Sequence, residues 1–250
     1  MRILMSGCGG RMGRFISDIC EAREAVIAAG VDIADVAGTS YPIYRKISEV
    51  TETCDVIIDF SYHTAVCDVL EYARAHSLPL VIATTGHTDF EKAKIAEASR
   101  FIPIFKSANM SIGVALVTEL CRRAAAFLQD DFDIEIVEKH HNKKLDAPSG
   151  TALMIADAMN SVLNANDEYI YDRHAEHRPR GKHEIGFASV RGGTIVGEHD
   201  VIFAGHDEVI TVSHSAISRE IFAEGALRAA RFIIGKPVGE YDMGALIKEI

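Results

Sequence analysis

The sequence predicts an α/β protein in which a doubly wound parallel sheet is accompanied by a second, α+β domain. Residues 2–111 alternate short apolar runs with helical patterns, which is typical of a parallel sheet covered by helices on both faces. After about Ser111, strict polar–apolar alternation and short turns indicate an antiparallel or mixed sheet. The predicted boundaries are 1–111 plus 219–250 for the first domain and 112–218 for the second.

The first domain begins with a strand, a glycine-rich turn and an amphipathic helix. Continuous apolar runs such as DVIIDF indicate strands buried on both faces, and amphipathic stretches between them indicate helices. The expected strands are Arg2–Ser6, Val26–Val31, Asp55–Phe60, Leu80–Thr84 and Ile102–Lys106. The expected helices are Arg11–Ala22, Thr64–His76 and Asp89–Arg100, and a last helix, Arg219–Ile234, is expected to return to this domain.

The second domain opens with a long helix, expected at Ile112–Leu128. The strand that follows at Phe132–Val137 alternates strictly, FDIEIV, which indicates a sheet with one wet face. The remaining elements are expected to be a helix at Ser149–Leu163 and strands at Glu184–Arg191, Thr194–Ala204 and Glu208–His214. Residues 172–183 are basic and polar, and we expect a mobile loop there.

Composition argues against several classes of protein. A net charge of −10 opposes nonspecific binding to nucleic acid or to an anionic membrane. The N-terminal residues lack the pattern of a secretory signal, and no apolar run approaches the length that spans a membrane. Five widely spaced cysteines without a CxxC pair indicate reduced thiols, so we expect a cytoplasmic protein without a disulfide framework.

The glycine-rich segment GCGGRMG stands directly between the first strand and the first helix. A pyrophosphate must approach such a turn closely, and the helix N-terminus then faces the phosphates, so the segment indicates a Rossmann-like dinucleotide site. Its spacing departs from G-x-G-x-x-G, because Met12 stands at the third glycine position and Gly13 follows it. The predicted cofactor-binding residues of this loop are Gly7, Cys8, Gly9, Gly10, Arg11 and Met12.

Asp32 ends the second strand, where a carboxylate can accept hydrogen bonds from an adenosine ribose. The alternative is a solvated turn aspartate. Ile33 follows, so the adjacent residue offers no cation to a 2′-phosphate, which favours NADH over NADPH. Arg11, Arg45 or Lys46 remain as residues that can reach such a phosphate.

Three further segments follow predicted strands. Ligands of doubly wound sheets bind outside the carboxyl ends of the strands, so these segments are expected to border the nicotinamide, although each can also be an ordinary polar loop. The residues concerned are Phe60 in the first segment, Ala83, Thr84 and Thr85 in the second, and Ser107, Ala108, Asn109 and Met110 in the third.

The segment EKHHNKKLDAPSGT, Glu138–Thr151, combines proton donors with the start of a helix. Imidazole and ammonium groups can donate protons near neutral pH, and His140, His141 and Lys144 stand close together. Free N–H groups of Gly150 and Thr151 at the helix start, together with Lys144, can bind a substrate carboxylate. The pattern predicts a site for an acidic small molecule that is protonated during reaction.

Two other interpretations of this segment exist. It can be a charged surface loop that ends in a capped helix, since caps with Ser-Gly are common. It can also contribute to a metal site with His174, His177 or His183, but those histidines lack a partner helix with HExxH spacing, so we expect no metal.

Five segments, in order along nearly the whole chain, resemble the dihydrodipicolinate reductase family. They are GCGGRMGR at Gly7–Arg14, ATTG at Ala83–Gly86, SANMS at Ser107–Ser111, EKHHNKKLDAPSGTA at Glu138–Ala152 and IGFASVRGGTIVGEH at Ile185–His199. The resemblance implies reduction of 4-hydroxy-tetrahydrodipicolinate to tetrahydrodipicolinate by NADH or NADPH, in the diaminopimelate route to lysine. It also implies a homotetramer assembled through the sheet of the second domain.

The resemblance assigns roles to individual residues. The family's proton donor falls on His140 and its assisting lysine on Lys144. His141, Lys144, Gly150 and Thr151 match substrate-contacting positions. Ile33 replaces an arginine that many members carry, Ala83 replaces a more usual glycine, and the stretch 38–50 is shorter than in longer members. These departures leave the choice between NADH and NADPH open.

The predicted reaction adds hydride to an unsaturated, dicarboxylated nitrogen ring, and the electron-rich enamine that results takes a proton from His140. One rival interpretation keeps the dinucleotide domain but changes the substrate, as in amino-acid or sugar dehydrogenases. Another is a redox-sensing regulator that binds NADH without reacting, which would require a basic DNA-binding module that the chain does not show.

Overall fold

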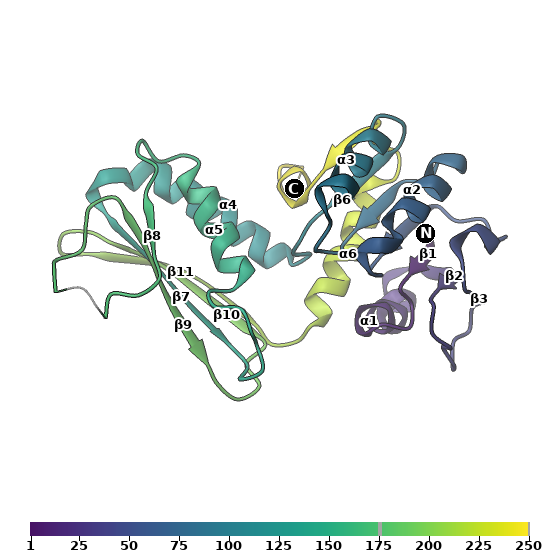
Figure 1. The fold of residues 1–250 in the computed structure, drawn as a ribbon, viewed down its shortest axis with the longest axis horizontal. Coiled ribbons are helices and arrows are strands. Elements are labelled where there is room, and N and C mark those ends of the chain that lie inside the picture. Colours follow the sequence, from purple (N-terminus) through teal and green to yellow (C-terminus); the bar gives the residue numbers. More distant parts are fainter. Residues whose placement is uncertain (175–176, 250) are drawn as a thin grey trace. The chain divides into compact units, whose positions relative to one another are not determined.

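The computed structural model describes residues 1–174 and 177–249, which form two compact units (Figure 1). The first unit consists of Met1–Ile112 and the chain from Glu220 onward, and the second of Gly113–Arg219. Each unit is built around its own sheet, the first parallel and the second mixed. The predicted fold class is therefore confirmed.

Within the described residues, the first unit has a seven-stranded parallel sheet in the order β12-β6-β5-β4-β1-β2-β3. Its strands are β1 (Arg2–Ser6), β2 (Val26–Val31), β3 (Ile43–Tyr44), β4 (Val56–Asp59), β5 (Leu80–Ile82), β6 (Pro103–Lys106) and β12 (Gly239–Tyr241). The central strands are buried on both faces, as their continuous apolar runs require. The strand order reverses between β1 and β4, whose last residues Ser6 and Asp59 are register partners. This switch point is where open α/β sheets bind ligands.

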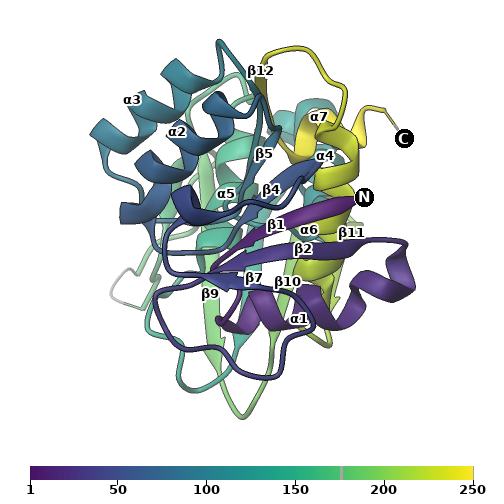
Figure 2. The same ribbon diagram turned by 90° about the vertical axis from the view of Figure 1, so that its right-hand side faces the viewer.

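Helices cover both faces of this sheet. They are α1 (Arg11–Cys20), α2 (Val66–Ala75), α3 (Asp89–Ala98), α6 (Glu220–Ile233) and α7 (Met243–Ile247), with short 3₁₀ turns η1 (Glu21–Arg23), η2 (Ile47–Glu49) and η3 (His63–Ala65). Figures 1 and 2 show α2 and α3 on one face, and α1 with α6 on the other. Helix α6 thus packs in the first unit, and α7 has no counterpart among the predicted helices.

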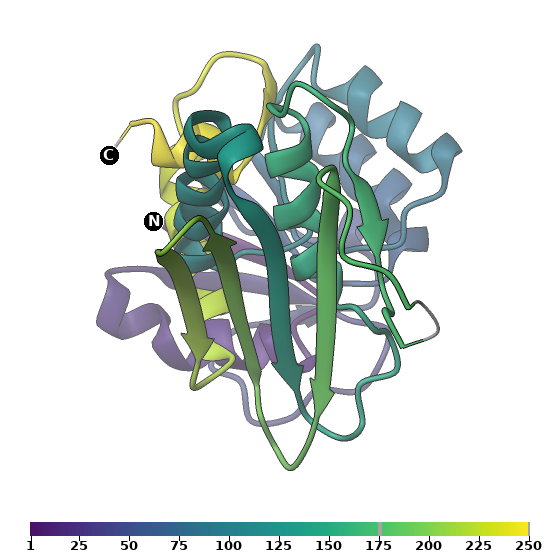
Figure 3. The same ribbon diagram turned by 90° about the vertical axis from the view of Figure 1, so that its left-hand side faces the viewer.

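The second unit has a five-stranded sheet in the order β11-β10-β7-β9-β8, as far as the described residues form it. The strands are β7 (Asp133–His140), β8 (Glu168–Ile170), β9 (Glu184–Arg191), β10 (Gly197–Ala204) and β11 (Val209–Ala216). Neighbours β7, β10 and β11 run antiparallel, whereas β7, β9 and β8 run parallel. Figure 3 shows α4 (Ile112–Leu128) and α5 (Gly150–Asn160) on the same face of the sheet.

Alternation along β7 decides which side chains reach the core of the second unit. Ile134, Ile136, Glu138 and His140 point to the helix-covered face and are buried, while the residues between them are half-buried. Glu138 and His140 thus continue the row of buried side chains that begins with Ile134 and Ile136. α4 (followed by the short turn η4, Gln129–Asp131) buries a stripe of smaller residues and leaves Leu116, Leu120 and Phe127 exposed.

The predicted mobile loop 172–183 is more constrained than expected, although residues 175 and 176 lie outside the described part. Arg173 and Arg178 bind the buried Glu184, and Arg180 binds Asp133 and Glu135. The acidic ends of β7 and β9 thus hold the arginines, which the sequence pattern alone cannot reveal. Within residues 1–174 and 177–249, no helix combines the length and apolarity needed to cross a membrane.

Candidate functional site

The turn between β1 and α1 depends on three glycines spaced three residues apart. Gly7 has φ +80°, and a Cβ there would lie 2.7 Å from the carbonyl oxygen of Phe60. A Cβ on Gly13 would lie 2.5 Å from the Gly7 carbonyl oxygen, whereas one on Gly10 would lie 3.3 Å from it. Close packing of helix on strand is therefore assured by Gly13, not by position 12 as the motif spacing suggested. Gly10 is the N-cap and has no side chain, so it leaves the first-turn N–H groups open to a phosphate.

Asp32 is joined to this turn. Its Oδ2 accepts a hydrogen bond of 2.8 Å from the Gly9 N–H, and its Oδ1 accepts one of 2.9 Å from Ala34 N–H. The carboxylate is thus held beside the glycine turn at the end of β2, which is the position from which an acidic residue can reach a ribose. Ile33, next in the chain, is 90% exposed.

A cavity of about 680 Å³ lies at the carboxyl ends of β1, β2 and β4. Gly7, Gly10, Asp32 and Phe60, all predicted to bind the cofactor, contribute to its lining. Arg45 and Lys46 line the same cavity, and Arg45 also bonds the Ile33 carbonyl and the Asp35 carboxylate. Two cations therefore stand close to the ribose-binding position, although neither is adjacent to Asp32 in the sequence.

A second cavity, of about 490 Å³, shares Phe60 with the first and is lined also by Ala83, Thr84 and Thr85. The fully buried carboxylate of Asp59 organises its wall. Asp59 accepts hydrogen bonds from the Ser61 hydroxyl at 2.6 Å and from the Thr84 hydroxyl at 3.0 Å. The two strand-end loops are thereby fixed relative to each other.

The SANMS loop after β6 is held by its own side chains. Ser107 Oγ donates to the Asn109 carbonyl at 2.7 Å, and Asn109 Oδ1 accepts the Ser111 N–H at 2.9 Å. The Met110 carbonyl presses against α6 at Gly225, where any Cβ would overlap it. Within the described part of the chain, neither of the two cavities described above is lined by Ser107–Met110.

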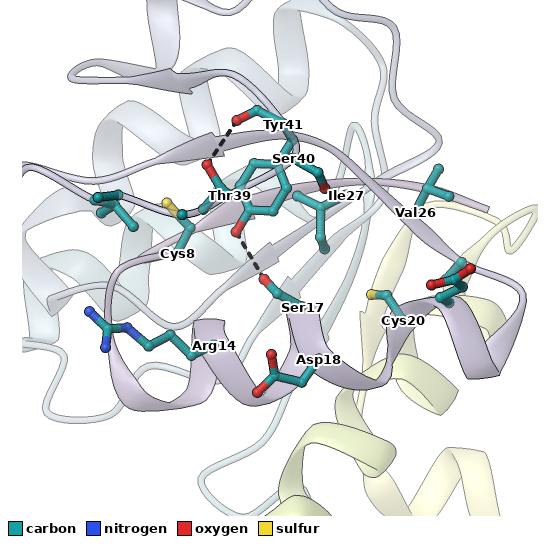
Figure 4. Close-up of a pocket in the computed structure, with 15 residues that line it drawn as sticks. Cys8, Arg14, Ser17, Asp18, Cys20, Val26, Ile27, Thr39, Ser40 and Tyr41 are labelled. Carbon is teal, nitrogen blue, oxygen red and sulfur yellow. Dashed lines mark hydrogen bonds between the residues drawn. The ribbon is translucent and has the colours of Figure 1, made fainter.

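Cys8 has a structural place in the turn. Its thiol borders a different cavity, of about 660 Å³, between α1 and the 36–41 segment, in which Ser17 and Tyr41 share a hydrogen bond (Figure 4). Burial raises the pKa of the Cys8 thiol to about 11, so the group is un-ionised. A Cβ on Gly30 would lie 2.7 Å from Cys8 Sγ, which shows how tightly the thiol packs on β2.

In the second unit, His140 ends β7 with its ring on the covered face. It is 8% exposed, and its Nδ1 lies 2.5 Å from Oε2 of Glu138, two residues earlier on the same face. Burial lowers the pKa of His140, while the adjacent Glu138 carboxylate opposes that shift. The bonded Nδ1 leaves Nε2 as the ring nitrogen that can exchange a proton with a ligand.

Glu138 is itself fully buried and is held from three sides. Arg191 of β9 donates to both carboxylate oxygens, at 2.8 and 2.6 Å, and the Ser149 N–H donates at 3.2 Å. Burial alone raises the pKa of Glu138, but the bonds from Arg191, Ser189 and His140 bring it to about 2. The group is therefore a carboxylate at neutral pH.

His199 of β10 lies beside His140, with the ring centroids 5.3 Å apart in an edge-on arrangement. Its Nε2 and the Ser149 hydroxyl share a hydrogen bond of 2.9 Å, and the same hydroxyl caps α5 by accepting the Ala152 N–H. Burial lowers the pKa of His199 to about 4, so this ring is neutral near pH 7.

The lysine predicted to bind a carboxylate already holds one. Lys144 Nζ lies 2.8 Å from Oδ1 of Asp146, which precedes the start of α5. The bond from Lys144 lowers the pKa of Asp146. The structure places His140 at the end of β7, Lys144 in the turn that follows, and Gly150 and Thr151 in the first turn of α5. His141, directly after β7, is half-buried.

Among the described residues, no group of three or more His, Cys, Asp or Glu side chains is arranged to hold a metal ion. Of the histidines considered for a metal site, His183 lies 3.3 Å from the Asp167 carboxylate, and His174 belongs to no cluster of possible metal ligands within the described residues.

Sequence reasoning missed several site residues. The sequence contains a signal for Glu138, because residues two apart on a strand share a face. It contains none for Arg191 and His199, because these residues reach the site through strand pairing. Arg191 lies opposite His140, and His199 lies opposite Glu138. Asp59 was read as part of an apolar strand and not as a buried carboxylate.

Comparison with known proteins agrees with this arrangement in both units. The model described as "Dihydrodipicolinate reductase, N-terminus" matches residues 1–110, and that described as "Dihydrodipicolinate reductase, C-terminus" matches residues 113–247. The 4-hydroxy-tetrahydrodipicolinate reductase of Caldanaerobacter subterraneus subsp. tengcongensis is 52% identical over 250 residues, covering 100% of this chain and 99% of that protein. The enzyme of the same name from Clostridium tetani is 46% identical, covering 99% and 97%. A dipicolinate-bound dihydrodipicolinate reductase from Paenisporosarcina sp. TG-14 has the same fold, with a TM-score of 0.82, 23% identity and 97% of each chain covered.

Proposed function

The chain belongs to the dihydrodipicolinate reductase family and reduces 4-hydroxy-tetrahydrodipicolinate with NAD(P)H, a step toward lysine, and we propose that His140 is its proton donor. The observation that carries this proposal is the pairing of His140 Nδ1 with the Glu138 carboxylate at 2.5 Å. A carboxylate on one ring nitrogen stabilises the imidazolium and leaves the other nitrogen as the acid.

The first unit fits a dinucleotide. Gly7 and Gly13 leave the backbone space that a pyrophosphate-binding turn requires, and Asp32 stands at the ribose position. When bound, NAD(P)H supplies the hydride. We assign its binding to the glycine turn, to Asp32 and to the strand-end loops that carry Phe60, Ala83 to Thr85 and Ser107 to Met110.

The substrate is a small dicarboxylate, and Lys144 with the Gly150 and Thr151 amides is proposed to bind one of its carboxylates. Asp146 supports the assignment of Lys144, because its carboxylate already lies 2.8 Å from the lysine Nζ. A substrate carboxylate can replace it there. The solved structure from Paenisporosarcina holds dipicolinate, a planar dicarboxylate of similar size. His141 is proposed as a further substrate contact.

In the proposed chemical step, the 4-hydroxyl group of the substrate leaves as water, which gives the unsaturated ring to which hydride is added. His140 Nε2 then transfers a proton to the ring carbon that the hydride addition makes electron-rich. Lys144 offsets the negative charge of the bound carboxylate. General acid catalysis of this kind contributes on the order of a hundred- to ten-thousandfold in rate. His140 then regains its proton from solvent.

For the cofactor, Asp32 and the exposed Ile33 favour NADH, while Arg45 and Lys46 on the same cavity can neutralise a 2′-phosphate. We therefore propose that NADH is preferred and that NADPH is also accepted. Arg45→Ala is expected to raise the KM for NADPH by roughly tenfold, the size expected for one lost phosphate contact, and to leave that for NADH unchanged.

We further propose a cytoplasmic homotetramer. Support comes from the sheet of the second unit, whose exposed apolar residues include Val190, Val209 and Ile210. The five cysteines are all free thiols, in keeping with a reducing compartment. Sedimentation of the full chain gives the assembly directly: a monomer at micromolar concentration contradicts the tetramer.

An assay that generates the unstable substrate in place tests the activity, with NADH and NADPH supplied in turn. We expect oxidation of both nucleotides, with the lower KM for NADH. If NADH or NADPH is oxidised with another keto or imino acid, and not with 4-hydroxy-tetrahydrodipicolinate, the protein is instead a different dehydrogenase.

A further inference from the structure

One buried carboxylate connects the two parts of the candidate active site in the second unit. Glu138 has no exposed surface, and its two oxygens face different partners. Oε2 lies 2.5 Å from His140 Nδ1, and Oε1 accepts the Ser149 N–H at 3.2 Å. The first partner is the proposed proton donor, and the second is the N-cap of α5, whose first N–H group is proposed to bind the substrate carboxylate.

Arg191 fixes the orientation of that carboxylate. It donates to both oxygens of Glu138 in a two-point contact and also to the Asp146 carbonyl at 2.7 Å. Because a planar guanidinium opposite a carboxylate allows one relative geometry, Glu138 cannot rotate away from His140 without losing a bond. The same guanidinium compensates the charge of a group that burial would otherwise neutralise.

The neighbouring strand completes the enclosure of the His140 ring. His199 holds the Ser149 hydroxyl at 2.9 Å, and β10 passes so close that a Cβ on Gly197 would lie 3.0 Å from His140 Nε2. The charged and titratable groups that face His140 are therefore Glu138, Arg191 and His199 from the strands and Lys144 from the loop after β7. Glu138 is the anion among them.

We propose that Glu138 is a positioning residue that holds His140 with Nε2 toward the substrate and, through Ser149, keeps the start of α5 in register with that ring. Arg191 is the clamp that makes this arrangement rigid. The inference rests on the proposed role of His140, since it explains how one carboxylate sets both the direction of proton transfer and the place of the substrate carboxylate.

The test is Glu138→Gln in the full chain, which keeps the size of the side chain and removes its charge. We expect kcat to fall by about tenfold or more, as is usual for residues that orient a catalytic group, with a smaller change in the KM for the substrate. The high-pH decline of kcat should move to lower pH, because His140 loses the anion that favours its protonated form. Glu198→Gln is the matched control: it removes a carboxylate that binds Lys139 on the opposite face of the sheet, and it should leave the pH profile unchanged.

A second readout separates this inference from the proposed function. ¹⁵N NMR of histidine-labelled protein follows the titration of His140 without any turnover, and Glu138→Gln should shift it toward lower pH. Arg191→Lys, which keeps the charge but breaks the two-point contact, should change kcat in the same direction and by less. If both variants are folded and show the wild-type pH profile and His140 titration, Glu138 has no positioning role. Full turnover in His140→Gln would overturn the proton-donor assignment, whereas the effect of Glu138→Gln on the His140 titration would still show whether Glu138 holds that ring.

Discussion

The two candidate sites use different chemistry for recognition. In the first unit, the glycine turn offers backbone N–H groups, and Gly7 and Gly13 matter because a side chain there would collide with the main chain. In the second unit, a connected set of ionisable side chains, Glu138, His140 and Arg191, carries the site. A site made of backbone N–H groups does not respond to pH but does respond to the size of the side chains in the turn. A site of buried charges responds to both. The comparison therefore predicts different responses to mutation in the two units.

The largest effect is expected for His140→Gln. Loss of a general acid lowers kcat by on the order of a hundred- to ten-thousandfold, with little change in the KM for either reactant. His141→Gln is the comparison, because that ring is not bonded to Glu138, and it should raise the KM for the substrate more than it lowers kcat. Steady-state rates with freshly generated substrate measure both. Unchanged turnover in His140→Gln would exclude it as the proton donor.

In the first unit, the corresponding test is one of volume. The Cβ of Gly13→Ala would lie 2.5 Å from the Gly7 carbonyl oxygen and 2.6 Å from Cys8 Cα, and backbone atoms cannot move aside cheaply. We expect a loss of stability of about 1–3 kcal/mol and weaker NADH binding. Gly10→Ala meets its nearest atom only at 3.3 Å, so its effects should be smaller. Titration calorimetry with NADH gives the affinities, and equal binding by wild type and Gly13→Ala contradicts the assigned spacing.

The smallest effect concerns pH and stability. In the folded chain, burial lowers the pKa of His199 from 6.5 to about 4, so between these values the unfolded chain binds more protons. The stability that this neutral ring contributes is therefore fully present above pH 6.5 and is lost as the pH falls through about 4. The pKa values of His140 and His214 are lowered by burial too, which acts in the same direction.

His199→Gln should flatten this dependence, whereas His206→Gln, at a side chain that is 97% exposed, should not. Urea unfolding of the full chain between pH 7.5 and 4 measures the difference. If the free energy of unfolding depends on pH in His199→Gln as it does in the wild type, a group other than His199 causes the dependence.

The strands, helices and the glycine turn could be predicted because their determinants are local. Apolar runs such as VIID identify a strand, and the change to alternation in FDIEIV identifies a different kind of sheet. Short elements such as β3, β8 and β12 were missed, since two or three residues carry no periodicity and form only against a neighbouring strand.

The candidate site could be predicted only as far as it lies in one segment. His140, Lys144 and Gly150 are near each other in the sequence, so a single motif predicts them together. Arg191 reaches Glu138 only because β7 and β9 pair in parallel, and His199 because β10 pairs with β7 in the opposite direction. Register between strands is set by the whole sheet, so no short pattern contains it.

The central claim is that the His140 imidazole delivers the proton while Glu138 holds it in place. A crystal structure of the full chain with NADPH and dipicolinate tests this most directly. We predict His140 Nε2 at about 3–3.5 Å from a ring carbon of the bound dicarboxylate, with Nδ1 still on Glu138. A bound ring whose nearest proton donor is another side chain, with His140 turned away from it, would contradict the account.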